Sequence, residues 1–265
     1  MNDEGLRIEH DGPVLRLTID RPEVHNALPD PALGLLADTV IAAGSDDTTR
    51  VIVVTGTGSS FCAGIDLPSV NAPSRARPRT GHVQRGLAAR AHRLVRGLWE
   101  SQLPVVAAVR GHAIGIGCNL ALAADFVVAS RTARFAEPFV QRGLTPDSGG
   151  SFLLPRLIGV ARAKEMLLLG DPVDAEQAYD WGLVTRLVDD DALEAETLAL
   201  VERLARASTV AVGLTKSLVH HSLESSLTQA LAHEAVVEEL AIRSGDFKEG
   251  LKAFVEKRDP RFEGR

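Results

Sequence analysis

Two glycine-rich turns in this chain can present backbone N–H groups to one oxygen atom. Residues 51–54 (VIVV) form a short β-branched run, typical of a buried strand, and lead into residues 55–67 (TGTGSSFCAGIDL). A second run of this kind, residues 105–109 (VVAAV), leads into three glycines within residues 111–117 and then into a helix-like apolar run. A strand that turns through glycines into a helix leaves N–H groups unpaired beside the positive end of the helix dipole. One such turn is ordinary turn chemistry, but two together can hold an oxygen that gains negative charge.

The residues of these turns resemble those of the crotonase superfamily, which contains the enoyl-CoA hydratases and isomerases. The blocks FCAGIDL (residues 61–67) and GHAIGIGCNLALAADF (residues 111–126) stand in the order of that superfamily and at about its separation. The resemblance runs from Arg21 to Arg258. It implies an α/β fold, a crotonase-like spiral of ββα units with a C-terminal helical oligomerisation region, and an acyl-CoA thioester substrate. It also places the two backbone N–H donors of an oxyanion hole at Ile65 and Ile116.

The positions of the acid–base glutamates of the family's hydratases hold other residues here. Those enzymes have one glutamate three residues past the second donor and another in a later Pro-Glu pair. This chain has Asn119 and Phe139 at these positions, and neither side chain exchanges a proton at neutral pH. Glu137 is interpreted as a carboxylate at the surface or at a subunit contact. The resemblance to hydratases therefore does not extend to their two-carboxylate mechanism.

Asp147 is the carboxylate that remains for acid–base chemistry. The block GLTPDSGGSFLLPR (residues 143–156) resembles that of the 2-(1,2-epoxy-1,2-dihydrophenyl)acetyl-CoA isomerases, in which a polar uncharged residue replaces the first glutamate. This resemblance implies that Asp147 is the catalytic base and that Asn119 stands at the missing-glutamate position. Apolar neighbours are expected to desolvate Asp147 and make it a stronger base: Phe139, Leu144, Phe152 and Leu153.

Two other interpretations of Asp147 stay open. Asp147 would be purely structural if it served as the N-cap of the helix that follows, because aspartate is a favoured cap. It would be a nucleophile if the chain followed the chlorobenzoyl-CoA dehalogenase branch, which pairs its aspartate with an acyl pocket rich in aromatic residues. Trp99 and Trp181 are the only tryptophans in this chain, which disfavours the nucleophile.

The resemblance also indicates residues that bind coenzyme A. Five lie around the first glycine-rich turn, and two lie in the last helix, which would come from a neighbouring subunit: Arg21, Val24, Ala63, Asp66, Leu67, Phe254 and Lys257. Lys257 would meet a phosphate as a point charge, unless it is a solvated lysine at a helix end. No cofactor beyond coenzyme A, the carrier part of the substrate, is implied, and no metal-ligand cluster is visible. The partner expected is the chain itself, as a homotrimer or a dimer of trimers.

The elements that position these residues can be traced along the chain. Strands are predicted at residues 14–19, 51–54, 105–109, 125–129 and 183–188. Helices are predicted at residues 29–43, 84–102, 151–158 with a kink at Pro155, 161–169 and 175–181, then at 191–207, 209–225, 227–243 and 246–257. We therefore divide the chain into an α/β core, residues 1–190, and a helical region, residues 191–265. The resemblance implies that the core holds the active site and that the helical region serves trimerisation. Residues 68–82, without an apolar period, are predicted to form a loop, and the resemblance implies that this loop lies over the active site.

Composition and charge exclude several classes of function. A net charge of −6 leaves no basic excess for binding nucleic acid. No apolar run reaches the roughly 18 residues of a membrane span, and the first ten residues hold no apolar signal region, so a cytoplasmic protein is expected. Both cysteines, Cys62 and Cys118, lie in the glycine-rich turns, which favours buried, reduced thiols.

The sequence thus predicts an acyl-CoA enzyme that isomerises an unsaturated acyl group, aromatic-derived groups included, through an oxyanion-stabilised thioester enolate. Asp147 would be its single base. One alternative is an enoyl-CoA hydratase of fatty-acid oxidation, which would add water to crotonyl-CoA. Another is a catalytically silent acyl-CoA-binding scaffold, which would bind thioesters without exchanging their α-protons. A β-branched residue in place of Gly115 or Gly117 is expected to lower activity far more than stability.

Overall fold

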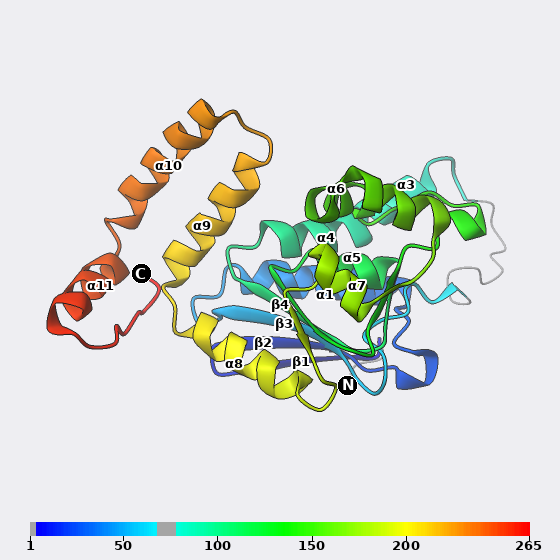
Figure 1. The fold of residues 1–265 in the computed structure, drawn as a ribbon, viewed down its shortest axis with the longest axis horizontal. Coiled ribbons are helices and arrows are strands. Elements are labelled where there is room, and N and C mark those ends of the chain that lie inside the picture. The colour runs from blue at the N-terminus through cyan, green and yellow to red at the C-terminus, as the bar shows by residue number, and fades with distance from the viewer. Residues whose placement is uncertain (1–3, 68–77) are drawn as a thin grey trace.

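The fold is built on a six-stranded sheet. In the computed structural model, which describes residues 4–67 and 78–265, its strands stand in the order β1-β2-β3-β4-β6-β9 (Figure 1). β1 pairs antiparallel with β2, and the later pairings in this sheet are parallel. The strands are β1 (Leu6–Asp11), β2 (Val14–Ile19), β3 (Val51–Gly56), β4 (Val105–Val109), β6 (Phe126–Ser130) and β9 (Arg186–Val188). A smaller sheet has the order β5-β7-β8: β5 (His112–Ile114), β7 (Arg134–Ala136) and β8 (Val173–Asp174).

Helices cover both faces of the large sheet. On one face, Ile52 and Val54 of β3 pack into the main core with α1 (Asp30–Ala43) and α4 (Ala91–Glu100). On the other face, Val51 and Val53 pack against Leu200 and its neighbours on α8 (Leu193–Ala205). Figure 1 shows α1 and α4 on one side of the sheet and α8 on the other. Because both faces are buried, β3 and β4 read in the sequence as unbroken apolar runs.

The remaining elements of the first 190 residues are short, apart from one long helix. They are η1 (Pro22–Val24), α3 (His82–Ala89), α5 (Ile116–Leu122), η2 (Val140–Arg142), α6 (Gly150–Leu169) and α7 (Ala175–Trp181). The α/β fold, with its parallel-rich sheet and helical C-terminal region, confirms the fold class predicted from the sequence. The predicted loop over the active site lies mostly outside the described residues, since the structure describes only residues 78–82 of it.

Two predicted helices differ from the structure. The helix predicted over residues 84–102 is broken at Arg90, whose φ of −128° and ψ of −81° are not helical, so α3 and α4 meet there. No kink occurs at Pro155, whereas Gly159, with φ 77° and ψ 162°, breaks α6 between the two predicted helices 151–158 and 161–169. Pro155 sits in the second turn of α6. Glycine, which adopts a positive φ without steric cost, is the residue that breaks the helix.

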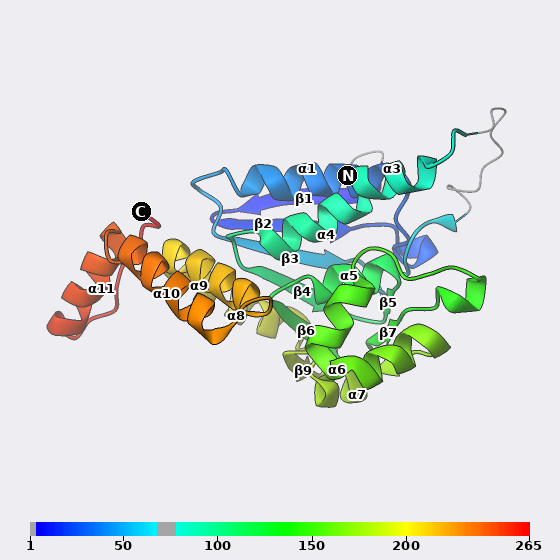
Figure 2. The same ribbon diagram turned by 90° about the horizontal axis from the view of Figure 1, so that it is seen from above.

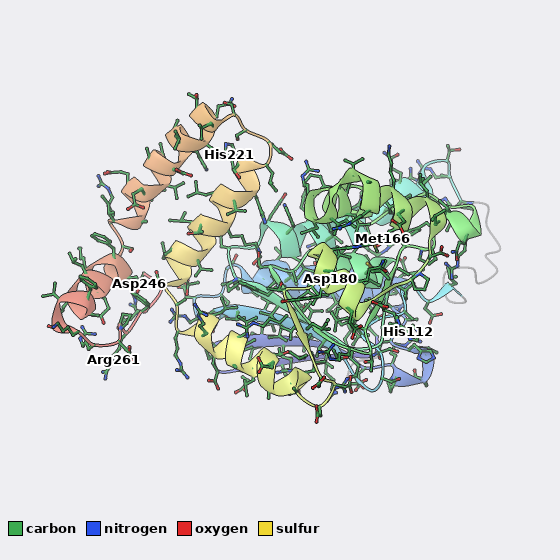
Figure 3. All side chains as sticks on the ribbon, viewed as in Figure 1. His112, Met166, Asp180, His221, Asp246 and Arg261 are labelled. Atoms are coloured by element: carbon green, nitrogen blue, oxygen red, sulfur yellow. The ribbon has the colours of Figure 1, made fainter. Side chains whose placement is uncertain are left out.

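Three C-terminal helices project away from the sheet. They are α9 (Thr209–Ser222), α10 (Leu227–Ala241) and α11 (Gly245–Glu256), and Figures 1 and 2 both place α11 at the opposite end of the molecule from α3. The tail folds back onto α11, where Asp246, labelled in Figure 3, accepts a 2.8 Å hydrogen bond from the N–H of Glu263. Exposed apolar side chains line these helices: Val219, Leu223, Leu227, Leu231, Val236, Leu240, Leu251, Phe254 and Val255. Among the described residues, no helix is long and apolar enough to cross a membrane.

Candidate active site

The two glycine-rich turns lie against each other. The N–H of Cys62 donates to the carbonyl of His112 at 2.7 Å, and the N–H of Ile114 donates to the carbonyl of Cys62 at 2.9 Å. These bonds form a short parallel bridge between the turn after β3 and strand β5. A Cβ on Gly64 would lie 3.0 Å from the carbonyl oxygen of Ile114, so glycine permits this approach. The bridge therefore joins the two segments that carry the predicted donors.

Each predicted donor follows a glycine whose φ is positive. Gly64 has φ 104° before Ile65, and Gly115 has φ 56° before Ile116, the first residue of α5. Within the described part of the chain, neither N–H donates to a protein acceptor. The N–H of Ile116 belongs to a helix N-terminus, which favours negative charge. Two unpaired N–H groups at adjoining turns suit an oxygen that becomes an oxyanion.

Glu137 is buried, which corrects its interpretation as a surface or subunit-contact carboxylate. Its side chain has no solvent exposure, and its Oε2 lies 3.5 Å from Nδ2 of Asn119, which is also fully buried. The sequence signal for this was the position of Glu137 directly after β7, the strand that pairs with β5. A Cβ on Gly150 would lie 3.0 Å from Oδ1 of Asn119 and 3.5 Å from Oε2 of Glu137. The start of α6 therefore closes over both side chains.

Asp147 stands in a turn just before α6, and its side chain does not cap that helix. The N-cap is Gly149, with no side-chain hydrogen bond, whereas the carboxylate of Asp147 accepts a hydrogen bond from Oγ of Ser148. The interpretation of Asp147 as a side-chain N-cap is therefore wrong. Ser148 has φ 53° and Gly149 has φ 93°, so two successive residues adopt the left-handed region. Such a turn persists only where its surroundings hold it.

The residues predicted to contact coenzyme A fall into two groups in one chain. Arg21 forms an ion pair with Asp66 at 2.9 Å and donates to the carbonyl of Ala27, which ties η1 to the first glycine-rich turn. Ala63, Val24 and Leu67 belong to the same region, and the last two are about two-fifths exposed. Phe254 and Lys257 lie at the end of α11, far from α3 and α6 in Figures 1 and 2, and are exposed. One chain therefore does not bring the two groups together.

A cavity of about 770 Å³ lies between α4, α6 and α9. Ser148 and Gly149, which follow Asp147, form part of its wall. Trp99 lies inside it, stacked on His220 at 3.8 Å between ring centroids and edge-on to Phe152 at 5.8 Å. Val95 and Leu153 add apolar wall, and polar side chains line the rest: His92, Lys216, Ser217, His221 and Glu224. Figure 3 labels His221 on α9.

Sequence reasoning missed this cavity because its wall comes from three helices that are distant in the chain. Trp99 and Phe152 read in the sequence only as apolar positions on helix faces. The small number of tryptophans was taken as a sign against an aromatic pocket, but the structure surrounds Trp99 with Phe152 and His220. The guanidinium of Arg156 lies 3.6 Å from the centroid of the Phe152 ring and extends this group.

Comparisons with known proteins place the chain among acyl-CoA enzymes. A family model described as enoyl-CoA hydratase/isomerase matches residues 9–265. The 1,2-epoxyphenylacetyl-CoA isomerase of Escherichia coli (strain K12) is 40% identical over 254 residues, which cover 95% of each chain. The 2,3-dehydroadipyl-CoA hydratase of the same organism is 36% identical over 256 residues, 95% of this chain and 96% of that one. A crystal structure of an enoyl-CoA hydratase from Bacillus anthracis has a TM-score of 0.91 at 31% identity and covers 99% of this chain and 100% of its own.

Proposed function

This chain belongs to the enoyl-CoA hydratase/isomerase family, and from that premise we propose that it isomerises an unsaturated acyl-CoA with Asp147 as the base. The observation that supports this most is the placement of Asp147. Its carboxylate is free of helix capping and half-buried, and it directly precedes Ser148 and Gly149 in the cavity wall. The 40% identity to a 1,2-epoxyphenylacetyl-CoA isomerase agrees with this choice.

The reaction needs one group that removes a proton from one carbon and returns it to another. The thioester oxygen would accept hydrogen bonds from the N–H groups of Ile65 and Ile116. These bonds strengthen as the oxygen gains charge in the enolate, and one such donor contributes roughly 10²–10³ in rate. Asp147 would take the α- or γ-proton, hold it while the enolate delocalises along the acyl chain, and return it to the other carbon. A single carboxylate over the acyl chain serves both steps.

We propose that the acyl group enters the cavity between α4, α6 and α9, whose lining includes Ser148 and Gly149 but not Asp147, Ile65 or Ile116. Its volume of about 770 Å³ is large for a four-carbon chain, and its apolar wall contains the rings of Trp99 and Phe152. Aromatic rings favour edge-to-face contacts with another ring. We therefore include arylacetyl thioesters and longer enoyl chains among the substrates. Coenzyme A would extend from the cavity toward Arg21 and Asp66, and no further cofactor is needed by this chemistry.

Oligomerisation would complete the coenzyme A site. The exposed apolar side chains on α9–α11 need a partner surface, because contiguous apolar patches on soluble proteins mark interaction sites. A homotrimer or a dimer of trimers would set α11 of one copy over η1 of another. Phe254 and Lys257 would then close over the nucleotide end of the carrier.

A hydratase is the second candidate, and one observation favours it. Glu137 gives the region a second carboxyl group beside Asn119, which the sequence alone did not reveal. Relatives such as the crotonyl-CoA hydratase of Syntrophomonas wolfei, 34% identical over 98% of both chains, carry hydratase names. However, hydration needs two carboxylates that both reach one water molecule beside the substrate, and the side chain of Glu137 is fully buried. Isomerisation therefore remains the better-supported reaction.

An NMR experiment in D₂O separates these reactions. The native protein is incubated with crotonyl-CoA, a 3-hexenoyl-CoA and an arylacetyl-CoA, and deuterium incorporation and products are followed. We expect a double-bond shift in 3-hexenoyl-CoA with deuterium at the α- and γ-carbons, and negligible 3-hydroxyacyl product. Rapid hydration of crotonyl-CoA would show a hydratase instead. Binding of all three thioesters without proton exchange would identify a silent acyl-CoA scaffold.

A further inference from the structure

Glu137 is a buried carboxyl group that the proposed reaction does not use. It follows β7, and the carbonyl of Ala136 accepts a 2.8 Å hydrogen bond from the N–H of Gly115. This bond sets Glu137 beside the turn that carries the N–H of Ile116. Its side chain meets the first turn of α5, where it contacts the thiol of Cys118 and the amide of Asn119. A carboxyl group in this position lies beneath the candidate site.

The surroundings of Glu137 favour its protonated form. Within the described residues no Lys, Arg or His forms an ion pair with it, and its Oε1 has no hydrogen-bond partner. Burial above all, with a smaller contribution from the negative charge of Asp147, raises the pKa of Glu137 to about 8, against the hydrogen bonds from Cys118 and Asn119. These surroundings favour the neutral acid at pH 7.

Asn119 links Glu137 to the turn that carries the base. Its Nδ2 lies 3.5 Å from Oε2 of Glu137 and 3.4 Å from the backbone carbonyl oxygen of Asp147, so two long hydrogen bonds share one NH₂ group. The next two residues in the chain, Ser148 and Gly149, both have positive φ. Asn119 therefore holds the turn at residues 147–149 through its hydrogen bond to the Asp147 carbonyl.

The charge state of Glu137 sets the strength of the hydrogen bond that it accepts from the NH₂ group of Asn119. A neutral carboxyl is an acceptor about as strong as the carbonyl of Asp147. A carboxylate is a stronger acceptor, because charge-assisted hydrogen bonds are shorter and roughly twice as strong. Each acceptor takes one of the two N–H groups of the amide, so a shorter bond to an ionised Glu137 would move Nδ2 of Asn119 toward it and lengthen the 3.4 Å bond to the Asp147 carbonyl. Ionisation would also set a second negative charge near the carboxylate of Asp147.

We propose that Glu137 is a positioning residue that must keep its proton, so that Asn119 holds the Asp147 turn in the catalytic geometry. This inference rests on the proposed role of Asp147 as the base. The titratable groups that act on Glu137 are Cys118 from α5 and Asp147 from the turn before α6. Burial raises the pKa of Cys118 well above its ordinary value, so Cys118 stays a thiol. The ionisation that loosens the turn is that of Glu137.

The pH dependence of kcat tests this proposal. It is measured between pH 6 and 9.5 for the native enzyme, for Glu137→Gln, which mimics the protonated acid, and for Glu165→Gln, an exposed control on α6. We expect native kcat to fall about tenfold per pH unit above pH 8 and the Glu165→Gln profile to match it. Glu137→Gln should keep the pH 7 rate within about threefold and show no fall above pH 8. The same alkaline fall in Glu137→Gln, or a native rate that is flat or rising there, would overturn the proposal.

Thermal unfolding gives a readout that needs no substrate. Because the pKa of Glu137 is higher in the folded than in the unfolded chain, its effect on stability is most favourable below the unfolded pKa of roughly 4.3 and is lost as pH rises to about 8. Glutamine has no such dependence. The Tm of Glu137→Gln should therefore exceed the native Tm by an amount that grows from pH 5 to pH 8, to about 5 °C or more. A Tm difference independent of pH would show that Glu137 holds no proton and would overturn the proposal.

The two readouts separate this proposal from the proposed function. A native enzyme that exchanges no proton on any thioester would overturn the base role of Asp147, and the positioning role with it, even if the Tm difference grows with pH. Proton exchange by the native enzyme together with identical kcat profiles for native and Glu137→Gln would overturn the positioning role alone.

Discussion

Gly117 packs so closely on Cys62 that a Cβ at position 117 would lie 2.3 Å from the carbonyl oxygen of Cys62. That carbonyl accepts the hydrogen bond from Ile114 that joins the two glycine-rich turns. Gly117→Val must therefore displace backbone. This close approach leads us to revise the sequence-based prediction for Gly117, because the substitution should lower stability as well as activity. We expect Gly117→Val to lose more than about 3 kcal/mol of unfolding free energy, beyond the usual range for overpacking. Urea unfolding measures this loss, and a native midpoint would contradict it.

For Gly115 we still expect that a substitution lowers activity far more than stability. A Cβ there would meet only the ring of Phe139, at 3.6 Å, but φ of 56° with ψ of −120° disfavours any residue with a side chain. Gly115→Ala is expected to rotate the peptide that carries the N–H of Ile116. We expect about a 10²-fold loss of kcat and a cost of roughly 1–3 kcal/mol in stability. Activity per folded molecule is the deciding measurement, and near-native kcat in a variant that melts early would disprove a role for this N–H.

Asp147→Asn removes the proton acceptor and keeps the shape of the side chain. Because Asp147 does not cap α6, thermal stability should change little, within about 0.5 kcal/mol. We expect isomerisation and α/γ-proton exchange to fall at least 10²-fold, the lower end of general-base contributions, with unchanged affinity for the thioester. Deuterium exchange and calorimetric binding are measured on the same preparation. Retention of more than about a tenth of the rate would mean that another group is the base.

Trp99 tests the assignment of the acyl cavity, and Trp181 provides a matched control. Trp181 packs at the edge of the core with Arg162 5.3 Å from its ring, and it does not line the cavity. We expect Trp99→Ala to raise KM for arylacetyl thioesters up to about tenfold, because the proposed contact between the indole and the substrate ring, worth about 0.5–1.5 kcal/mol, is lost. The KM for crotonyl-CoA should change less than threefold. Equal effects of Trp99→Ala and Trp181→Ala on arylacetyl thioesters would remove the cavity from the acyl site.

The sequence was sufficient where one local pattern determines one element. The runs VIVV and VVAAV became β3 and β4, and the glycines before Ile65 and Ile116 adopt the positive φ that such turns need. The C-terminal helices also follow from local periodicity. The exception was residues 84–102, where apolar spacing continues through Arg90 although the backbone breaks there. Periodicity records which side chains face the core, and it does not record a local change of φ and ψ.

The candidate site was only partly predictable, because it depends on contacts across the fold. Asn119, Glu137 and Gly150 come from α5, the end of β7 and the start of α6, and no spacing in the sequence shows that they touch. Glu137 was interpreted as a surface or subunit-contact carboxylate, because the turn at Pro138 hides the direction of its side chain in the sequence. Its burial is explained by the pairing of β7 with β5, which directs the next residue toward α5.

Asn119→Glu with Phe139→Glu would place glutamates where the family's hydratases have them. In this chain Nδ2 of Asn119 lies 3.5 Å from Oε2 of Glu137 in a fully buried position, so the first change sets a second carboxyl beside that of Glu137, and the two are expected to share one proton. We therefore expect the double variant to lose roughly 2–4 kcal/mol of stability and to hydrate crotonyl-CoA poorly.

Adding Glu137→Gln should relieve this conflict, because an amide can donate to the introduced carboxylate. The triple variant is expected to recover at least half of the lost Tm and to hydrate crotonyl-CoA measurably faster than either the double variant or the native protein. The absorbance of the enoyl thioester follows the reaction, and melting curves are recorded at the same pH. A double variant that is as stable and as active a hydratase as the triple variant would show that the Glu137 carboxyl does not constrain the chemistry at position 119.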